Sequence, residues 1–116
     1  MVTPISRLAY AVEYELLDQA VESERGVQRI FPGAGARGDA MNFRVRLHKA
    51  RDYDRRENKK IYPPDDPMHG QTLYAQLTVR APYWDDEREV WVLKIERNIA
   101  GEMIVEDIPP AESHAD

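Results

Sequence analysis

The sequence predicts an α+β fold in which two helices pack on a three-stranded antiparallel β-meander, with a proline-rich extended strap between the second helix and the sheet. Three observations support this prediction. Apolar residues recur at three- and four-residue spacing near the N-terminus, they alternate with polar residues near the C-terminus, and prolines cluster between these parts. The 116 residues suffice for one hydrophobic core. We expect a single domain over residues 1–110, followed by a polar tail over 111–116.

The first helix is expected to begin at Thr3-Pro4, since a hydroxyl N-cap followed by proline at the first helical position is typical of helix starts. Gly26 is expected to end it. This helix carries two adjacent apolar stripes at helical spacing. One comprises Ile5, Leu8, Ala9, Val12, Leu16 and Ala20, and the other comprises Tyr10, Tyr14, Leu17 and Val21. Either the sheet and the second helix cover one stripe each, or the tyrosine-bearing stripe contacts another protein chain, a second copy included.

Residues 39–62 contain neither glycine nor proline, and two interpretations compete for them. Apolar residues that share one helical face are Ala40, Phe43, Leu47, Ala50 and Tyr53, with Asp39 as the N-cap. Residues 41–47 instead alternate apolar and polar side chains, as a strand does. Val45 is the only β-branched residue between 39 and 60, and a strand ending near Lys49 leaves an unusually long polar loop. These observations favour the helix, with the strand as the alternative.

The sheet is expected in the second half of the chain. Period-two patterning predicts strands over 77–81, 90–97 and 103–108. In the clearest of them, 90–97, one face would carry Trp91, Leu93 and Ile95, and the other Val90 and Val92. Before them, the prolines of IYPPDDPMHG (61–70) remove backbone donors and fix φ, which predicts an extended, polyproline-like strap. Val27–Phe31 is expected only as a short extended segment.

Residues 33–38 match the spacing Gly-x-Gly-x-x-Gly of dinucleotide-binding loops, but their surroundings do not fit. Such a loop follows a buried parallel strand, and an acidic residue ends the next strand about 20 residues on. Here the preceding VQRIF is short and half polar, and ENKKIYPP lies at the later position. The lysine of a phosphate-binding Walker loop is also missing. We therefore expect a flexible loop and no nucleotide cofactor.

No side chains predict catalysis or a metal. The chain has no cysteine, which excludes thiolate chemistry and disulfides. His48 and Asp52 would share a helical face among several bases, so they are expected as a solvated pair. The doublets Asp65-Asp66 and Asp85-Asp86 lack the spacing of a calcium loop and are expected as turn residues. We expect a non-enzymatic protein without cofactor or metal; a small enzyme is the remaining alternative.

The N-terminal 20 residues contain three acidic residues and neither a basic nor a long apolar region, so no signal peptide is expected. No apolar run approaches the roughly 20 residues that span a bilayer. These features predict a cytoplasmic protein that does not enter the membrane.

Charge is distributed unevenly, although the net charge is −5. Residues 1–24 contain one basic and five acidic residues, residues 44–60 contain eight basic and three acidic residues, and residues 61–116 contain four basic and twelve acidic residues. The basic segment 44–60 is therefore the main candidate for a binding site.

On a helix, the basic segment would present a ridge formed by Arg44, Arg51, Arg55 and Lys59. Guanidinium groups on a rigid ridge suit phosphates, and tyrosines nearby suit unpaired bases. We hypothesise that the segment binds an anionic partner, nucleic acid first. The phosphate contacts are assigned to Arg44, Arg51, Arg55, Arg56 and Lys59, and the stacking contacts to Tyr53 and Tyr62. The opposing interpretation is that acids within the fold neutralise these bases.

A second functional class is a protein-binding adaptor or inhibitor. Its interface would be the stripe of Tyr10, Tyr14, Leu17 and Val21, or an acidic sheet that mimics the phosphates of nucleic acid. The acidic residues expected on that sheet are Asp85, Asp86, Glu87, Glu89, Glu96, Glu102 and Glu106.

Overall fold

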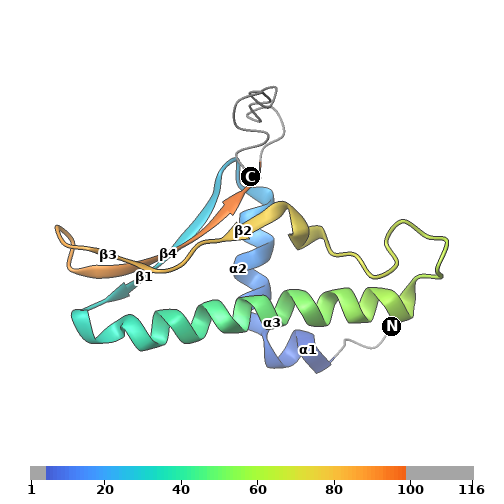
Figure 1. The fold of residues 1–116 in the computed structure, drawn as a ribbon, viewed down its shortest axis with the longest axis horizontal. Coiled ribbons are helices and arrows are strands. Elements are labelled where there is room, and N and C mark those ends of the chain that lie inside the picture. The colour runs from blue at the N-terminus through green and yellow to red at the C-terminus, as the bar shows by residue number, and fades with distance from the viewer. Residues whose placement is uncertain (1–4, 99–116) are drawn as a thin grey trace, which may run out of the picture.

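A computed structural model describes residues 5–98, with side chains from Arg7 onward (Figure 1). The helices are α1 (Ile5–Ala9), α2 (Ala11–Glu22) and α3 (Arg37–Ile61), and the strands of the antiparallel sheet are β1 (Gly26–Pro32), β2 (Leu77–Val79), β3 (Tyr83–Asp85) and β4 (Val90–Arg97). The predicted α+β class is confirmed, although the helices and strands are more numerous than predicted. The proposed cap Thr3, the strand predicted at 103–108 and the tail at 111–116 lie outside the described residues.

The first predicted helix is divided at Tyr10, and a side chain from α3 explains the break. In a continuous helix the carbonyl of Ala9 would accept the backbone N–H of Glu13. Here that carbonyl accepts a hydrogen bond from Nη2 of Arg46 at 2.9 Å, and Tyr10 has the non-helical angles φ −119° and ψ 34°. The prediction of one helix is wrong because the competing donor lies 37 residues away in the sequence.

Residues 39–61 form a helix, as the favoured interpretation predicts, and Tyr62 follows it with extended backbone angles. α3 is 25 residues long and begins at Arg37, two residues before the expected N-cap. Ala36 occupies the N-cap position without a side-chain hydrogen bond, and Asp39 lies in the first turn. Asp39 is therefore placed to interact with the positive end of the helix dipole, while its predicted capping role is wrong.

β4 is the central strand of the sheet. β1 pairs antiparallel with it over its whole length, with Gly26 opposite Glu96 and Pro32 opposite Val90. On the other edge β4 pairs with β3 and then with β2, where Val79 lies opposite Ile95. All three strands that pair with β4 therefore precede it in the chain, and β1 occupies the edge of β4 that the meander prediction assigned to residues 103–108.

β1 starts at a glycine because the backbones of β1 and β4 approach closely there. Gly26 has a φ of 106°, a left-handed conformation that favours glycine. A Cβ at this position would lie 2.0 Å from the carbonyl oxygen of Ile95. The glycine thus permits strand pairing, whereas the helix before it already ends at Glu22.

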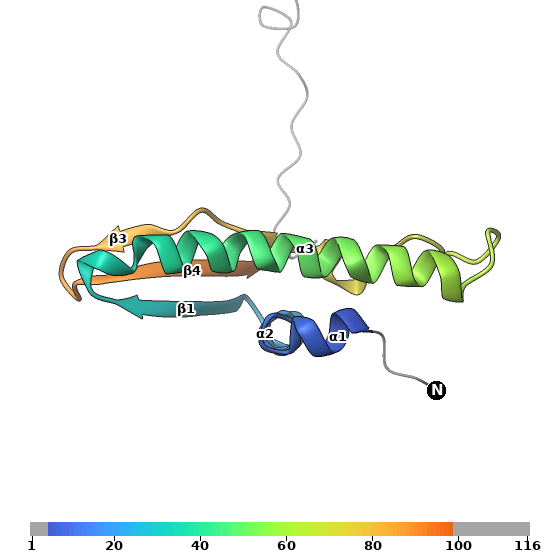
Figure 2. The same cartoon turned by 90° about the horizontal axis from the view of Figure 1, so that it is seen from below.

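One hydrophobic core joins the helices to the sheet. α2 and α3 both contribute buried residues to it, and α3 runs along the sheet with α2 beside it (Figure 2). The largest fully buried side chains in the core are Leu17, Leu47, Leu93 and Ile95. The alternation in β4 that predicts a strand therefore also identifies the residues that pack on the helices.

Residues 62–72 form a series of turns beside the end of α3, so the prediction of an extended strap is wrong. The carboxylate of Asp66 accepts the backbone N–H of Met68 at 2.8 Å, and the carbonyl of Asp66 accepts the N–H of His69 at 3.0 Å. Asn58 of α3 donates to the carbonyl of Gln71 at 2.6 Å. The prolines prevent a helix here, but the aspartate favours a turn over extended chain.

Candidate nucleic-acid interface

The position of each basic side chain on α3 follows from the buried side of the helix. Phe43, Leu47 and Ala50 are buried against the core, as the helical pattern predicts. Tyr53, assigned to that face from sequence, is exposed instead, with 36% of its surface accessible. The eight basic residues of segment 44–60 are thus divided between the flanks of the helix and its solvent side.

The flank toward β2 carries Arg44, His48, Arg51 and Arg55, which we call the inner edge of α3. Arg51 is half-buried, and its Nη1 donates to the carbonyls of Leu77 at 2.8 Å and Tyr74 at 3.4 Å. It therefore satisfies acceptors at and just before the start of strand β2 rather than presenting a charge to solvent. Burial, reinforced by the charge of Arg55, lowers the pKa of Arg51.

His48 completes this arrangement. Its Nδ1 lies 3.1 Å from Nη2 of Arg51, and an arginine can only donate, so the imidazole accepts through Nδ1. Burial lowers the pKa of His48, and the charges of Arg51 and Arg44 lower it further. The pair predicted between His48 and Asp52 gives way to a different contact, because Asp52 accepts from Arg55 at 3.0 Å.

Several other bases have acidic partners within the fold. Arg46 pairs with the buried Glu13 at 3.0 Å, Arg55 pairs with Asp52 at 3.0 Å, and Lys60 lies 3.6 Å from Glu57. Neutralisation within the fold therefore accounts for these cations, as the opposing interpretation expects. The predicted ridge is divided accordingly: Arg51 is held by backbone carbonyls, Arg55 pairs with Asp52 on the surface of α3, and Arg44 is half-buried with an unpartnered Nε.

The solvent side of α3 differs from the inner edge. Lys49, Arg56 and Lys59 are exposed, and within the described residues none of them has an acidic partner. Tyr53 lies between them on the helix, and the guanidinium carbon of Arg56 is 5.4 Å from the centre of its ring. We call Lys49, Tyr53, Arg56 and Lys59 the outer face of α3.

The tyrosine of the outer face belongs to a longer row of stacked groups. Arg46 lies over Tyr10 at 4.4 Å, the rings of Tyr10 and Tyr53 are 5.5 Å apart, and Arg56 follows. The row joins the end of α1 to α3. It holds Tyr53 in a defined orientation while leaving part of the ring accessible, which suits stacking on a planar ligand.

Tyr62, the second predicted stacking residue, is half-buried at the end of α3. Its carbonyl oxygen lies 2.8 Å from Nδ1 of His69 in the following turns. The structure therefore places Tyr62 outside the outer face.

The stripe of α2 predicted to contact a partner lies in the core. Leu17 is fully buried, and Tyr14 is buried with its hydroxyl donating to the carbonyl of Ala50 at 2.7 Å. Tyr10 and Val21 are partly buried against the same cluster. In the other stripe, Leu8 and Val12 expose 71% and 58% of their surfaces, whereas Leu16 is partly buried and Ala20 is fully buried. The exposed apolar side chains therefore belong to the stripe that was not predicted to contact a partner.

A polar network beneath α1 has no counterpart in the sequence analysis. Arg7 donates to Asp54 at 3.0 Å and to the hydroxyl of Tyr74 at 2.9 Å, and that hydroxyl donates to Asp18 at 2.5 Å. Thr72 also donates to Asp54. Burial and the hydrogen bond to Asp18 raise the pKa of Tyr74. The network connects all three helices, and its groups satisfy one another.

The acidic doublets and the glycine-rich loop have local roles. Asp66 and Asp85 accept backbone N–H groups in turns, and Asp86 accepts from the indole of Trp84 at 3.3 Å. The loop joins the edge strand β1 to α3, so no parallel strand precedes it. The part of the chain that the structure describes contains no cluster of histidine and acidic residues able to hold a metal, and none of its helices could cross a membrane.

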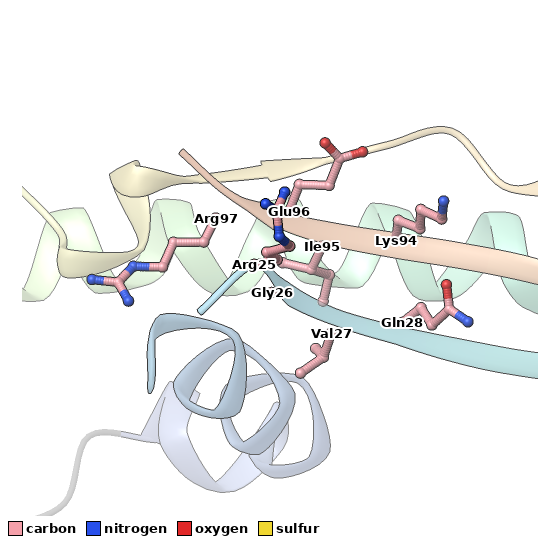
Figure 3. A pocket seen from close by; sticks show the side chains of 8 residues that line it. All are labelled: Arg25, Gly26, Val27, Gln28, Lys94, Ile95, Glu96 and Arg97. Carbon is pink, nitrogen blue, oxygen red and sulfur yellow. The ribbon is translucent and has the colours of Figure 1, made fainter. Parts of the chain in front are cut away.

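A hollow of about 480 Å³ lies where β1 begins and β4 ends (Figure 3). In Figure 3, Val27 and Ile95 point toward α2, while Lys94 and Glu96 lie on the other side of the sheet. Glu96 pairs with Arg80 at 3.1 Å, and Arg97 donates to the carbonyl of Ser23 at 3.2 Å. These charges are used within the fold, so the hollow is a weaker candidate site than the outer face of α3.

Comparison with protein-family models, curated proteins and solved structures finds no significant match to this chain. The functional argument therefore rests on the residues themselves.

Proposed function

We propose that the chain is a non-enzymatic binding module whose outer face of α3 contacts the phosphates of nucleic acid. The observation that carries this proposal is the group of three exposed cations on one rigid helix, beside an accessible tyrosine and without acidic partners among residues 7–98. Arg56, Lys59 and Tyr53 keep the roles expected from the sequence. Lys49 takes the place of Arg51, which donates to backbone carbonyls, and of Arg55, which pairs with Asp52 on the surface of α3.

The spacing of the outer face fits a short stretch of backbone. Lys49 and Lys59 are ten residues apart, which corresponds to about 15 Å along a helix. Each lysine or arginine that neutralises a phosphate releases counterions and strengthens binding. Tyr53 supplies a ring for an unpaired base, so the proposal favours single-stranded nucleic acid over duplex.

Fluorescence anisotropy with labelled single-stranded RNA, single-stranded DNA and duplex DNA tests the proposal. Three phosphate contacts predict that affinity falls roughly 20- to 40-fold between about 50 and 200 mM salt. The double substitution Lys49→Glu and Arg56→Glu is expected to abolish binding at the higher salt.

The matched control is Arg80→Glu with Arg88→Glu, two exposed bases on the sheet side of the molecule. It changes the net charge by the same amount and is expected to weaken binding only a few-fold through long-range electrostatics. Equal losses in the two variants, or no binding of any nucleic acid at about 50 mM salt, would contradict the proposal.

A further inference from the structure

The whole net charge of the chain resides in its last 18 residues. Residues 99–116 contain no lysine or arginine, and their five acidic residues are Glu102, Glu106, Asp107, Glu112 and Asp116. The complete sequence has 16 basic and 21 acidic residues, so residues 1–98 have 16 of each. A charge-balanced body is therefore joined to a polyanionic segment.

The outer face of α3 is complementary to this segment in charge. Four acids on or against the middle and end of α3 already have partners: Glu13 pairs with Arg46, Asp54 with Arg7, Asp52 with Arg55, and Glu57 with Lys60. Within the described structure, no acid forms an ion pair with Lys49, Arg56 or Lys59. An acidic segment from elsewhere in the chain would therefore be attracted to the outer face of α3.

The connection to β4 is long enough for this contact. The described chain ends at Asn98, after β4, and 18 residues follow. Fully extended, 18 residues span about 60 Å, whereas the longest dimension of the molecule is 55 Å. A tethered segment of this length has an effective concentration on the order of millimolar near surfaces within its reach. Weak individual ion pairs therefore suffice for substantial occupancy.

We propose that residues 102–116 bind the outer face of α3 and compete there with nucleic acid. The carboxylates of the segment occupy the positions that phosphates would take on Lys49, Arg56 and Lys59. The contact itself needs only charge complementarity and reach; the competition rests on the proposed function. Nucleic acid must then displace the segment, so affinity for short ligands is lower than the outer face alone would give.

The contact is tested directly with a spin label. Because the chain has no cysteine, Ser113→Cys provides a single attachment site for a nitroxide. In the full-length protein at about 50 mM salt, the label is expected to broaden the amide NMR signals of residues 49–59 selectively. Broadening should fade at about 500 mM salt, since exposed charge pairs are screened.

Two neutralised variants sharpen this experiment. The first carries Glu102→Gln, Glu106→Gln, Asp107→Asn, Glu112→Gln and Asp116→Asn. The control neutralises five exposed acids of the body in the same way, namely Glu15, Glu22, Glu24, Asp65 and Glu87. Both reach zero net charge, but only the first is expected to lose the broadening. The contact is refuted if the label does not broaden the signals of residues 49–59 in the protein that keeps all five acids. It is also refuted if both variants lose the broadening equally.

Nucleic-acid affinity tests the competition separately. The first variant is expected to bind single-stranded nucleic acid roughly three- to tenfold more tightly than the control at about 50 mM salt, since it lacks the tethered competitor. Equal affinities would overturn the competition. If neither variant binds nucleic acid, the proposed function fails, whereas the spin-label result still decides the contact.

Discussion

The two sides of α3 carry similar residues but differ in what surrounds them. On the inner edge, Arg51 donates to the carbonyl of Leu77, and Arg55 pairs with Asp52. On the outer face, Lys49 and Arg56 are exposed without an acidic partner in the described structure. Both sides contribute to the same basic run in the sequence. The comparison shows that the neighbours of a cation, and not its density along the chain, decide whether it is available to a ligand.

The largest expected effect concerns the buried side of α3. Asp54→Ala leaves Arg7 and Thr72 without their shared acceptor. Removing one partner of a buried pair costs about 3–5 kcal/mol, and the partial exposure of Arg7 reduces this to roughly 2–3 kcal/mol. Urea unfolding followed by circular dichroism measures the loss. The control Asp52→Ala removes an exposed acid of the same helix and should cost less than about 0.5 kcal/mol. Equal losses would contradict the distinction between the buried and the exposed acid of α3.

The next effect concerns the inner edge. Arg51→Met keeps the apolar stem but removes the donor to the carbonyls of Leu77 and Tyr74. The free energy of unfolding should fall by about 1–2 kcal/mol. Lys49→Met, the matched change on the outer face, should alter it by less than about 0.5 kcal/mol. A loss of stability in the Lys49 variant alone would reverse the assignment of the two sides.

A smaller, pH-dependent effect is expected at His48. Its pKa in the folded state lies below its ordinary value of 6.5, so the unfolded chain binds the proton first. Stability therefore decreases as the pH falls below about 6.5, until the folded state is protonated as well. His48→Gln keeps an acceptor for Arg51 and removes this contribution. The difference between urea midpoints at about pH 7 and pH 5.5 should be smaller in the variant; an unchanged difference would argue against the neutral imidazole.

The smallest effect is expected for the exposed pair of Asp52 and Arg55. Exposed pairs at this helical spacing contribute about 0.3–0.5 kcal/mol, and salt screens them. A double-mutant cycle with Asp52→Ala and Arg55→Ala should give a coupling energy in this range. A coupling above about 1 kcal/mol would contradict this, because the pair would then stabilise the fold as strongly as the hydrogen bonds of Arg51.

The sequence predicts the elements whose pattern is uninterrupted. Residues 90–97 carry apolar side chains on both faces of a strand and form β4, and the apolar spacing of α3 identifies its buried side. β1 is less visible because Arg29 occupies a position on the core side of the strand. Its guanidinium lies 4.7 Å from the ring of Phe31 and 4.3 Å from that of Phe43, so the two aromatic rings accommodate the charge. The charged residue interrupts the apolar pattern by which the strand would be predicted.

The candidate site is predicted only in part, for a related reason. Segment 44–60 is visible as a basic run, and a helical projection gives the relative positions of its side chains. The projection does not show that β2 lies against Arg51 or that Glu13 meets Arg46. These contacts link residues far apart in the sequence, and they determine which cations remain accessible.

The salt dependence of nucleic-acid affinity tests the central claim most directly. The slope of log affinity against log salt should become shallower by about 1.4–1.8 in the variant with Lys49→Ala and Arg56→Ala, because two phosphate contacts are lost. In the inner-edge variant Arg55→Ala the slope should not change. A slope that changes for Arg55→Ala and not for the outer-face variant would contradict the account, since it would place the phosphates on the inner edge.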